Sequence, residues 1–249
     1  MSMDMRVVVL AAGKGTRMRS EIPKVFIPLN GRPMIQHLLD SIKKSGADSR
    51  PVLVVGENKE QARRALGDGY DYVYQAEQLG TGHAVQCAER LLKGNARHVM
   101  VLYGDHPLVG AATIAKLAAL HKRQERLLSM MTTTVEDFDG WRAPFADFGR
   151  VIRDASGSIA GVVEAKDATP RQREITELNP AFFAFRAEWL WDNLKKIGNE
   201  NAAQEYYLGD LVRIAAAEGA PIASLAIDPR EAIGVNTPEH LAAAQSIVQ

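Results

Sequence analysis

A glycine-rich loop with basic neighbours is the first part of the sequence that could carry out chemistry. Residues 10–18 read Leu-Ala-Ala-Gly-Lys-Gly-Thr-Arg-Met, and Lys24 follows a few residues later. Glycines let backbone N–H groups approach phosphate oxygens closely, while Lys14, Arg17 and Lys24 can add charge-assisted hydrogen bonds. The residue types in this loop therefore suit the binding of a triphosphate.

The spacing within this loop argues against two common phosphate-binding motifs. It lacks the Gly-Lys-Ser/Thr triplet of a Walker A motif, and it is not a Gly-x-Gly-x-x-Gly sequence that opens a helix. P-loop kinases and dinucleotide-dependent dehydrogenases are thereby disfavoured. A glycine-rich turn with solvated basic residues would have the same composition, so the loop alone does not decide between a binding site and a turn.

The elements that must position this loop follow from the hydrophobic pattern. In the first half of the chain we predict strands at 6–10, 52–55 and 99–103 and helices at 33–45, 59–66, 82–92 and 111–126. Strands that alternate with amphipathic helices are typical of βαβ units and a largely parallel sheet. The loop then lies at the carboxyl end of the first strand, where open α/β sheets bind ligands.

The second half of the chain has shorter predicted strands, at 129–134, 149–153 and 159–164. The last two are joined by a turn at 154–157, in which Gly157 can adopt a positive φ, so they form a predicted hairpin and the sheet becomes mixed. Helices are predicted at 204–217 and 238–248. A smaller subdomain at about 135–230 would cover one end of the sheet, within a single domain.

Composition limits the partners of the chain. Lys and Arg together number 30, as do Asp and Glu, so no net charge draws the protein to nucleic acid or to a membrane surface. The apolar runs are far shorter than the roughly 20 residues that a membrane-spanning helix needs. The single cysteine, Cys87, cannot form an internal disulfide, which together with the N-terminal sequence favours a cytoplasmic protein.

Four ordered motifs give the chain a family resemblance. These are the loop at 10–18 with Pro23-Lys24, the segment Gln-Ala-Glu-Gln-Leu-Gly-Thr-Gly-His-Ala at 75–84, Tyr-Gly-Asp at 103–105, and Gly-Val-Val-Glu-Ala-Lys-Asp-Ala at 161–168. Over nearly the whole chain they resemble the sugar-1-phosphate nucleotidyltransferases, and among these the uridyltransferase domain of the bacterial bifunctional N-acetylglucosamine-1-phosphate enzyme.

The resemblance implies a fold and a division of labour along the chain. The fold would be α/β, with a Rossmann-like, mixed but mostly parallel sheet flanked by helices and a small sugar-binding subdomain. Residues 1 to about 134 would hold the nucleotide and residues from about 135 to 249 the sugar. No hexapeptide repeats of a β-helix acetyltransferase domain occur in the sequence, so we expect no acetyl transfer from this chain.

The resemblance also implies which residues bind the nucleotide. Gln75 would face the uracil base, because a primary amide can donate to or accept from a base edge that carries both a carbonyl and an N–H group. Gln75 and Gln78 could otherwise be ordinary surface amides. The nucleotide-binding residues implied are Leu10, Ala11, Ala12, Gly13, Gly15, Gln75, Gln78, Gly80, Thr81, Tyr103 and Gly104.

A magnesium site is implied at the end of the strand at 99–103. Asp105 and Asn236 match the two protein ligands of the family, and a carboxylate with an amide suits a hard ion whose other ligands are water and phosphate oxygens. Asp105 could instead cap a loop. Asn236 stands before Thr237-Pro238 and could instead begin the last helix.

Sugar contacts are implied for Gly149, Glu164, Asn179 and Tyr207, with Glu164 accepting hydrogen bonds from sugar hydroxyls. The sequence departs from the family pattern at Pro180-Ala181, after Asn179, and at Gly209, which stands where a threonine is usual. These departures leave the identity of the sugar open. His83 and Cys87 are interpreted as packing residues, and His106, which stands where the family has a small apolar residue, as a bystander side chain and not a catalyst.

The implied reaction is attack by a sugar 1-phosphate on the α-phosphorus of a triphosphate, most naturally UTP, with release of pyrophosphate. Arg17 and Lys24 would be the catalytic residues, because they reduce the repulsion between two anions; no protein nucleophile is needed. Two alternatives remain: transfer involving another hexose 1-phosphate or nucleotide, and a non-catalytic module that binds nucleotide sugars. The expected partners are thus small molecules.

Overall fold

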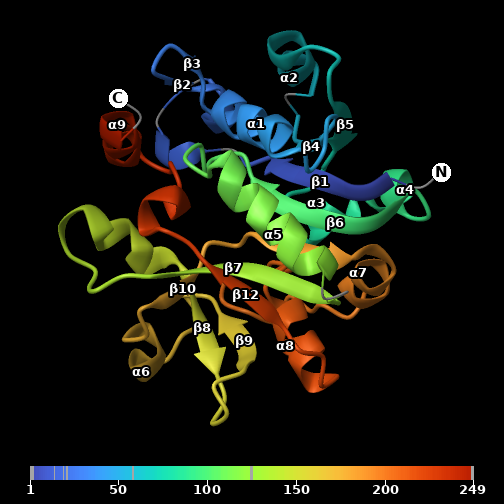
Figure 1. Ribbon diagram of the computed structural model, residues 1–249. Coiled ribbons are helices and arrows are strands. Elements are labelled where there is room, and N and C mark those ends of the chain that lie inside the picture. The colour runs from blue at the N-terminus through green and yellow to red at the C-terminus, as the bar shows by residue number, and fades with distance from the viewer. Residues whose placement is uncertain are drawn as a thin grey trace.

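A mixed β-sheet runs through the whole molecule (Figure 1). The computed structural model describes residues 3–13, 15–18, 20, 22–57, 59–123 and 126–247, so Lys14 of the glycine-rich loop lies outside the described residues. In the first half, β5 (Asp71–Tyr74), β4 (Val52–Val55), β1 (Met3–Ala11) and β6 (Ala96–Tyr103) pair in parallel in that order. Their carboxyl ends therefore meet at one edge.

The other half of the sheet is mainly antiparallel. The order continues through β11 (Phe183–Arg186), β7 (Leu128–Thr134), β10 (Glu177–Asn179), β8 (Gly149–Arg153) and β9 (Ile159–Val163), while β12 (Ala223–Ala226) pairs in parallel with β7. Strand β11, from late in the chain, lies between β6 and β7 and joins the two halves. A separate small ribbon is formed by β2 (Pro28–Leu29) and β3 (Arg32–Pro33). The α/β prediction and the mixed sheet are confirmed.

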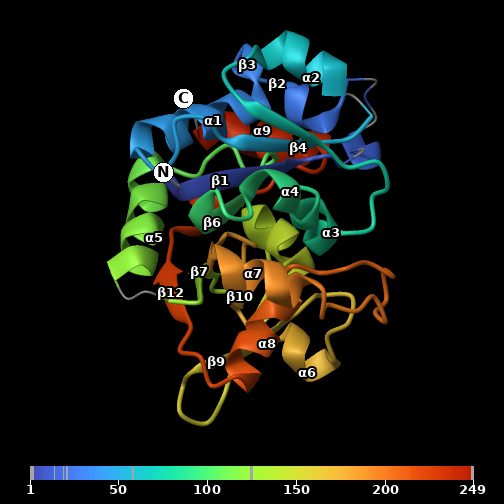
Figure 2. The ribbon, with the colours of Figure 1, turned by 90° about the vertical axis from the view of Figure 1, so that its right-hand side faces the viewer.

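Helices cover both faces of the sheet (Figures 1 and 2). One face packs against α1 (Met34–Ser45), α2 (Lys59–Leu66) and α5 (Ala111–Arg123), and the other against α3 (Thr81–Gln86), α4 (Glu89–Leu92), α7 (Ala187–Leu194) and α8 (Asp210–Ala217). Side chains of β1 alternate between the faces: Val7 and Val9 enter one core and Val8 the other, and all three are fully buried. Helices thus pack on both faces of the sheet and support the edge at which the parallel strands end.

Two further helices lie at the ends of the molecule. The short α6 (Pro170–Arg173) accompanies the β8–β9 hairpin, which projects from the end opposite α1 and α2 (Figure 1). Helix α9 (Pro238–Ile247) packs near β2, where Ala244 joins a small core with Leu29 and Met34. The predicted hairpin turn is confirmed: Gly157 has a φ of +83° between antiparallel β8 and β9.

Most predicted elements have bounds close to those observed, but two predicted helices were wrong in part. The segment 82–92 forms two helices, with a break at Cys87 and Ala88. The helix predicted at 204–217 begins only at Asp210, because Gln204 has a φ of +54° and the Tyr206 backbone bonds to the loop after β5: its N–H donates to Leu79 O and its carbonyl accepts from Gly82. Tertiary hydrogen bonds here outweigh the helical pattern.

Within the described parts of the chain, no helix combines the length and the apolar character needed to cross a bilayer.

Candidate active site

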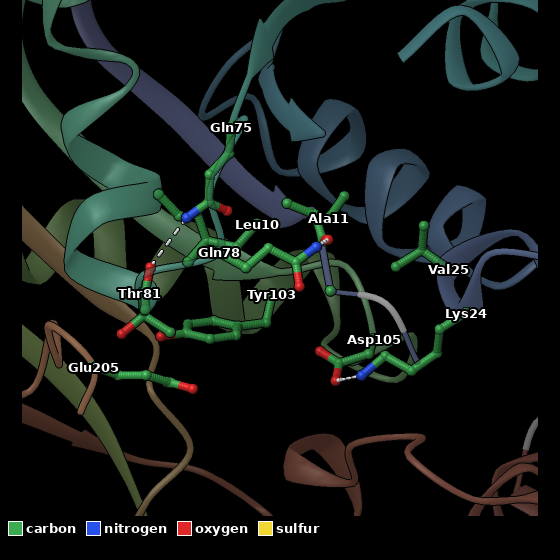
Figure 3. A pocket seen from close by; sticks show the side chains of 14 residues that line it. Leu10, Ala11, Lys24, Val25, Gln75, Gln78, Thr81, Tyr103, Asp105 and Glu205 are labelled. Carbon is green, nitrogen blue, oxygen red and sulfur yellow. Dashed lines mark hydrogen bonds and ion pairs between the residues drawn. The ribbon is translucent and has the colours of Figure 1, made fainter. Parts of the chain in front are cut away.

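A pocket opens where the parallel strands end (Figure 3). It is lined by Leu10, Ala11, Ala12, Gly13, Lys24, Val25, Gln75, Gln78, Gly80, Thr81, Ala84, Tyr103, Asp105 and Glu205. Nine of the predicted nucleotide-binding residues are in this lining, together with one predicted metal ligand and one predicted catalytic residue. Chain segments that are far apart in sequence thus converge on a single pocket.

The two predicted nucleotide-binding residues outside the lining, Gly15 and Gly104, pack against residues of the lining. Gly15 has a φ of +62°, and a Cβ there would lie 2.5 Å from the Cβ of Lys24. Gly104 donates its N–H to Leu10 O at 2.9 Å, and its own Cβ would meet Leu10 O and the Val25 side chain at 3.2 Å. Both glycines therefore permit close packing between neighbouring loops.

The loop that follows β5 is fastened to its surroundings by side-chain amides. Gln75 is only 4% exposed, and its Nε2 donates to Gly80 O at 3.3 Å and lies 3.1 Å from His83 Nδ1. Gln78 donates from its Nε2 to Ala12 O, and so ties this loop to the glycine-rich loop. His83 was interpreted as a packing residue, but it contacts Gln75, which lines the pocket.

Thr81 and Gly80 connect the pocket to the second half of the chain. Thr81 Oγ1 accepts a hydrogen bond from Leu208 N at 2.9 Å. Gly80 has a φ of +113°, and a Cβ there would lie 2.7 Å from both the N and the O of Tyr206. The same contact brings Glu205 into the pocket lining. Glu205 was not among the predicted site residues, although it stands two residues before Tyr207, which was.

Lys24, one of the two predicted catalytic residues, forms a cluster with both predicted metal ligands. Lys24 Nζ lies 2.5 Å from Asp105 Oδ2 and 2.8 Å from Asn236 Oδ1 (Figure 3 shows the first of these contacts). Asp105 follows β6, and its carbonyl accepts from Val235 N at 2.8 Å, which holds the Asn236 loop against it. Burial favours the neutral acid, but the Lys24 ammonium, with help from His106, holds the pKa of Asp105 below its usual value.

Asn236 does not serve as the cap of the last helix. Thr237 Oγ1 accepts from His240 N at 3.3 Å, while the Asn236 side chain turns to Lys24. His106 is 7% exposed, with its Nε2 3.8 Å from Asp105 Oδ1 and its ring edge-on to Phe182. Burial is the main cause of the lowered pKa of His106.

Arg17, the other predicted catalytic residue, lies at the surface and is not among the residues that line the pocket. Its side chain is 61% exposed, and Nη1 lies 3.7 Å from Asp147 Oδ2. An exposed pair at that distance contributes little to stability. The structure therefore leaves the Arg17 guanidinium accessible to an anion.

The predicted sugar-binding residues gather around β8, β9 and β10. Gly149 pairs with Asn179 across the two strands β8 and β10, and a Cβ at Gly149 would lie 3.2 Å from Glu164 Oε1. Asn179 is buried, and its Oδ1 accepts from Ala181 N at 3.0 Å, so this amide also holds the turn after β10. Burial and neighbouring carboxylates, Glu164 among them, raise the pKa of Tyr207 to about 12.

Glu164 is the most strongly perturbed carboxyl group of this region. Burial, and then repulsion from Asp210, Asp167 and Glu205, raise its pKa to about 7. A carboxyl group that is hard to ionise costs the folded protein stability at neutral pH, and this cost falls when the group is protonated or neutralised.

We therefore expect Glu164→Gln to stabilise the protein above neutral pH. The pKa is higher in the folded chain than in the unfolded one, so wild-type stability falls as the pH rises from about 4.5 to about 7. The variant loses this dependence and should gain up to about 3 kcal/mol at pH 8, but nothing near pH 4. Urea unfolding at both pH values measures this, with exposed Glu60→Gln as the control. An equal change in the free energy of unfolding at pH 4 and pH 8 would refute the raised pKa of Glu164.

Comparison with known proteins agrees with this geometry. A family model described as a MobA-like NTP transferase domain matches residues 7–201. Proteins named "Bifunctional protein GlmU" from an Exiguobacterium species and from Pelobacter propionicus are 40% and 41% identical to the chain over 99% of its length, and one from Cellvibrio japonicus is 42% identical over 87%. The chain spans about half the length of these relatives, 53%, 52% and 46% respectively. The chain belongs to the family of MobA-like NTP transferase domains.

Proposed function

We propose that the chain transfers the uridylyl group of UTP to N-acetylglucosamine 1-phosphate, giving UDP-N-acetylglucosamine and pyrophosphate. One observation carries this proposal: a single pocket is lined both by two side-chain amides that can read a base edge and by Lys24 and Asp105, and Lys24 also contacts Asn236. The motif at 75–84 and the identity with the GlmU proteins support uracil and this sugar.

The reaction needs two anions to be held in line. The N–H groups of the glycine-rich loop, with Arg17 and Lys24, would bind the phosphates and reduce their mutual repulsion, so that the phosphate oxygen of the sugar can attack the α-phosphorus. The attacking phosphate is already ionised near neutral pH, and no protein base is needed. Residues up to about 134 would hold the nucleotide, and Gly149, Glu164, Asn179 and Tyr207 would hold the sugar.

A divalent metal fits the Asp105–Asn236 pair. The Lys24 ammonium lies between Asp105 Oδ2 and Asn236 Oδ1, so both oxygens already face one cationic group. A carboxylate and an amide are the hard oxygen donors that magnesium prefers, with water and phosphate oxygens as its other ligands. When bound, Mg²⁺ would supply charge stabilisation to the reacting phosphates.

This arrangement predicts competition between Lys24 and the metal. We expect Lys24→Met to raise the affinity of the nucleotide-free protein for Mn²⁺ about 3- to 10-fold, because the Asp105 carboxylate loses its resident cation. Electron paramagnetic resonance of free Mn²⁺ measures the binding. Lys93→Met is a matched control, since Lys93 pairs with Glu89 on the surface. Unchanged or weaker Mn²⁺ binding in Lys24→Met would contradict the claim that the Lys24 ammonium and the metal compete for one position beside Asp105.

The proposed activity is tested by pyrophosphate release with each of the four common triphosphates and a panel of hexose 1-phosphates. We expect the highest kcat/KM for UTP with N-acetylglucosamine 1-phosphate. Unpaired buried polar groups lower binding by about 1–3 kcal/mol each, so a purine triphosphate should be used at least about fivefold less efficiently. Equal efficiency with ATP or GTP would overturn the choice of uracil.

A further inference from the structure

The orientation of the Gln75 amide is fixed by its neighbours. Its Nε2 lies 3.3 Å from Gly80 O, and a carbonyl oxygen can only accept a hydrogen bond, so the amide nitrogen must be the end that faces Gly80. Figure 3 shows the nitrogen turned towards the Thr81 side and the oxygen turned the other way, towards Ala11. The end of the amide that remains for a ligand is therefore the oxygen, which only accepts.

His83 supplies the second acceptor for the same nitrogen. His83 Nδ1 lies 3.1 Å from Gln75 Nε2, so it accepts from the amide and the proton of the neutral imidazole belongs on Nε2. Cys87, one helical turn further on, places its Sγ 4.0 Å from His83 Nε2. Burial raises the pKa of Cys87, which keeps the sulfur as a neutral thiol and a weak acceptor. In this arrangement Gln75 Nε2 donates to His83 Nδ1, and His83 Nε2 donates to the Cys87 sulfur.

Uracil and cytosine differ at the atoms that an amide oxygen would meet. Uracil carries a hydrogen on N3 and can donate to the oxygen, whereas cytosine has a lone pair on N3 that the oxygen repels. If the amide were reversed, its NH₂ group would instead favour cytosine. If the amide meets N3 of the base, its direction therefore favours uracil over cytosine.

We infer that His83 is a positioning residue that holds the Gln75 amide with its oxygen towards the nucleobase, and so makes the pocket select uracil over cytosine. The inference rests on the proposed function in one respect, namely that N3 of the base lies beside the Gln75 amide. The Gly80 contact is long at 3.3 Å, so without His83 the amide keeps a single weak acceptor and can turn. His83 itself acts only through Gln75.

Three variants on one helix test this inference. His83→Leu removes the acceptor, and His83→Asn restores one, because an Asn Oδ1 can take the place of the imidazole Nδ1. Gln86→Leu is the control, since Gln86 is an exposed residue at the end of the same helix α3. Equilibrium titration with UTP and CTP gives the ratio of the two affinities, and steady-state rates with both triphosphates give KM and kcat.

We expect His83→Leu to lower the UTP-to-CTP affinity ratio about 3- to 10-fold, the loss of one hydrogen bond, with the change in KM rather than in kcat. His83→Asn and Gln86→Leu should keep the ratio within about twofold of wild type. A His83→Leu protein that keeps the wild-type ratio overturns the inference, as does a wild type that binds CTP as well as UTP. A wild type that prefers UTP but transfers no uridylyl group refutes the proposed function alone, because the affinity ratios still test the role of His83.

Discussion

Asp105→Asn should lower kcat by about a hundredfold or more while nucleotide binding remains detectable. The substitution keeps the size of the side chain and one oxygen ligand. It removes the negative charge that faces the Lys24 ammonium and that would hold the metal. The contribution of a metal to transition-state stabilisation is several kcal/mol, which sets the expected loss. Gln75, Gln78 and the glycine-rich loop are untouched, so the triphosphate still has most of its contacts.

Magnesium-dependent pyrophosphate release and UTP titration, run side by side, measure the two effects. Asp68→Asn is a matched control, because Asp68 is exposed and pairs with Arg63 on the surface. Circular dichroism checks that the variant is folded. A variant with wild-type kcat would remove Asp105 from the reaction, and equal losses of binding and turnover would show that its role lies in nucleotide binding.

Gly80→Ala should damage both stability and nucleotide use. A Cβ at Gly80 would lie 2.7 Å from the backbone N and O of Tyr206, at a φ of +113° that side chains rarely tolerate. Backbone strain and overpacking each cost about 1–3 kcal/mol, so we expect a loss of about 3–5 kcal/mol in the free energy of unfolding. Displacing Gly80 also moves the acceptor of Gln75, and kcat/KM for UTP should fall about a hundredfold.

Gly94→Ala separates the two causes of that loss. Gly94 has a φ of +77°, but no atom lies within 4 Å of the position of its Cβ, so this variant carries the backbone strain without the clash. It should lose only about 1 kcal/mol and leave the KM for UTP unchanged. Urea unfolding of both variants gives the comparison. If Gly80→Ala were as stable as Gly94→Ala, the close contact with Tyr206 would be disproved.

Local patterns in the sequence were enough to predict much of the fold. The strand at 52–55 and the helix at 59–66 have the predicted bounds, because each is set by its own apolar period and its flanking polar residues. The helix predicted to begin at 204 failed because the Tyr206 backbone bonds to Leu79 and Gly82, more than 120 residues earlier in the chain. No local pattern records such a contact.

The same limit applies to the site. The motifs placed Gln75, Gly80, Thr81 and Asp105 together, since they follow strands whose carboxyl ends share an edge. The bridge from Lys24 to Asp105 and to Asn236 crosses 81 and 212 residues of sequence, and only the folded chain shows it. His83 looked like a packing residue because helical spacing says nothing about which way an amide faces.

The measurement that tests the account most directly is product analysis of the purified chain incubated with UTP, N-acetylglucosamine 1-phosphate and Mg²⁺. Phosphorus NMR and mass spectrometry would identify the nucleotide sugar and pyrophosphate together. We predict UDP-N-acetylglucosamine and pyrophosphate in equal amounts, with neither formed when the sugar phosphate or the metal is left out. Pyrophosphate released from UTP without the sugar phosphate, or no nucleotide sugar from any triphosphate by a folded protein that binds UTP, would contradict the account.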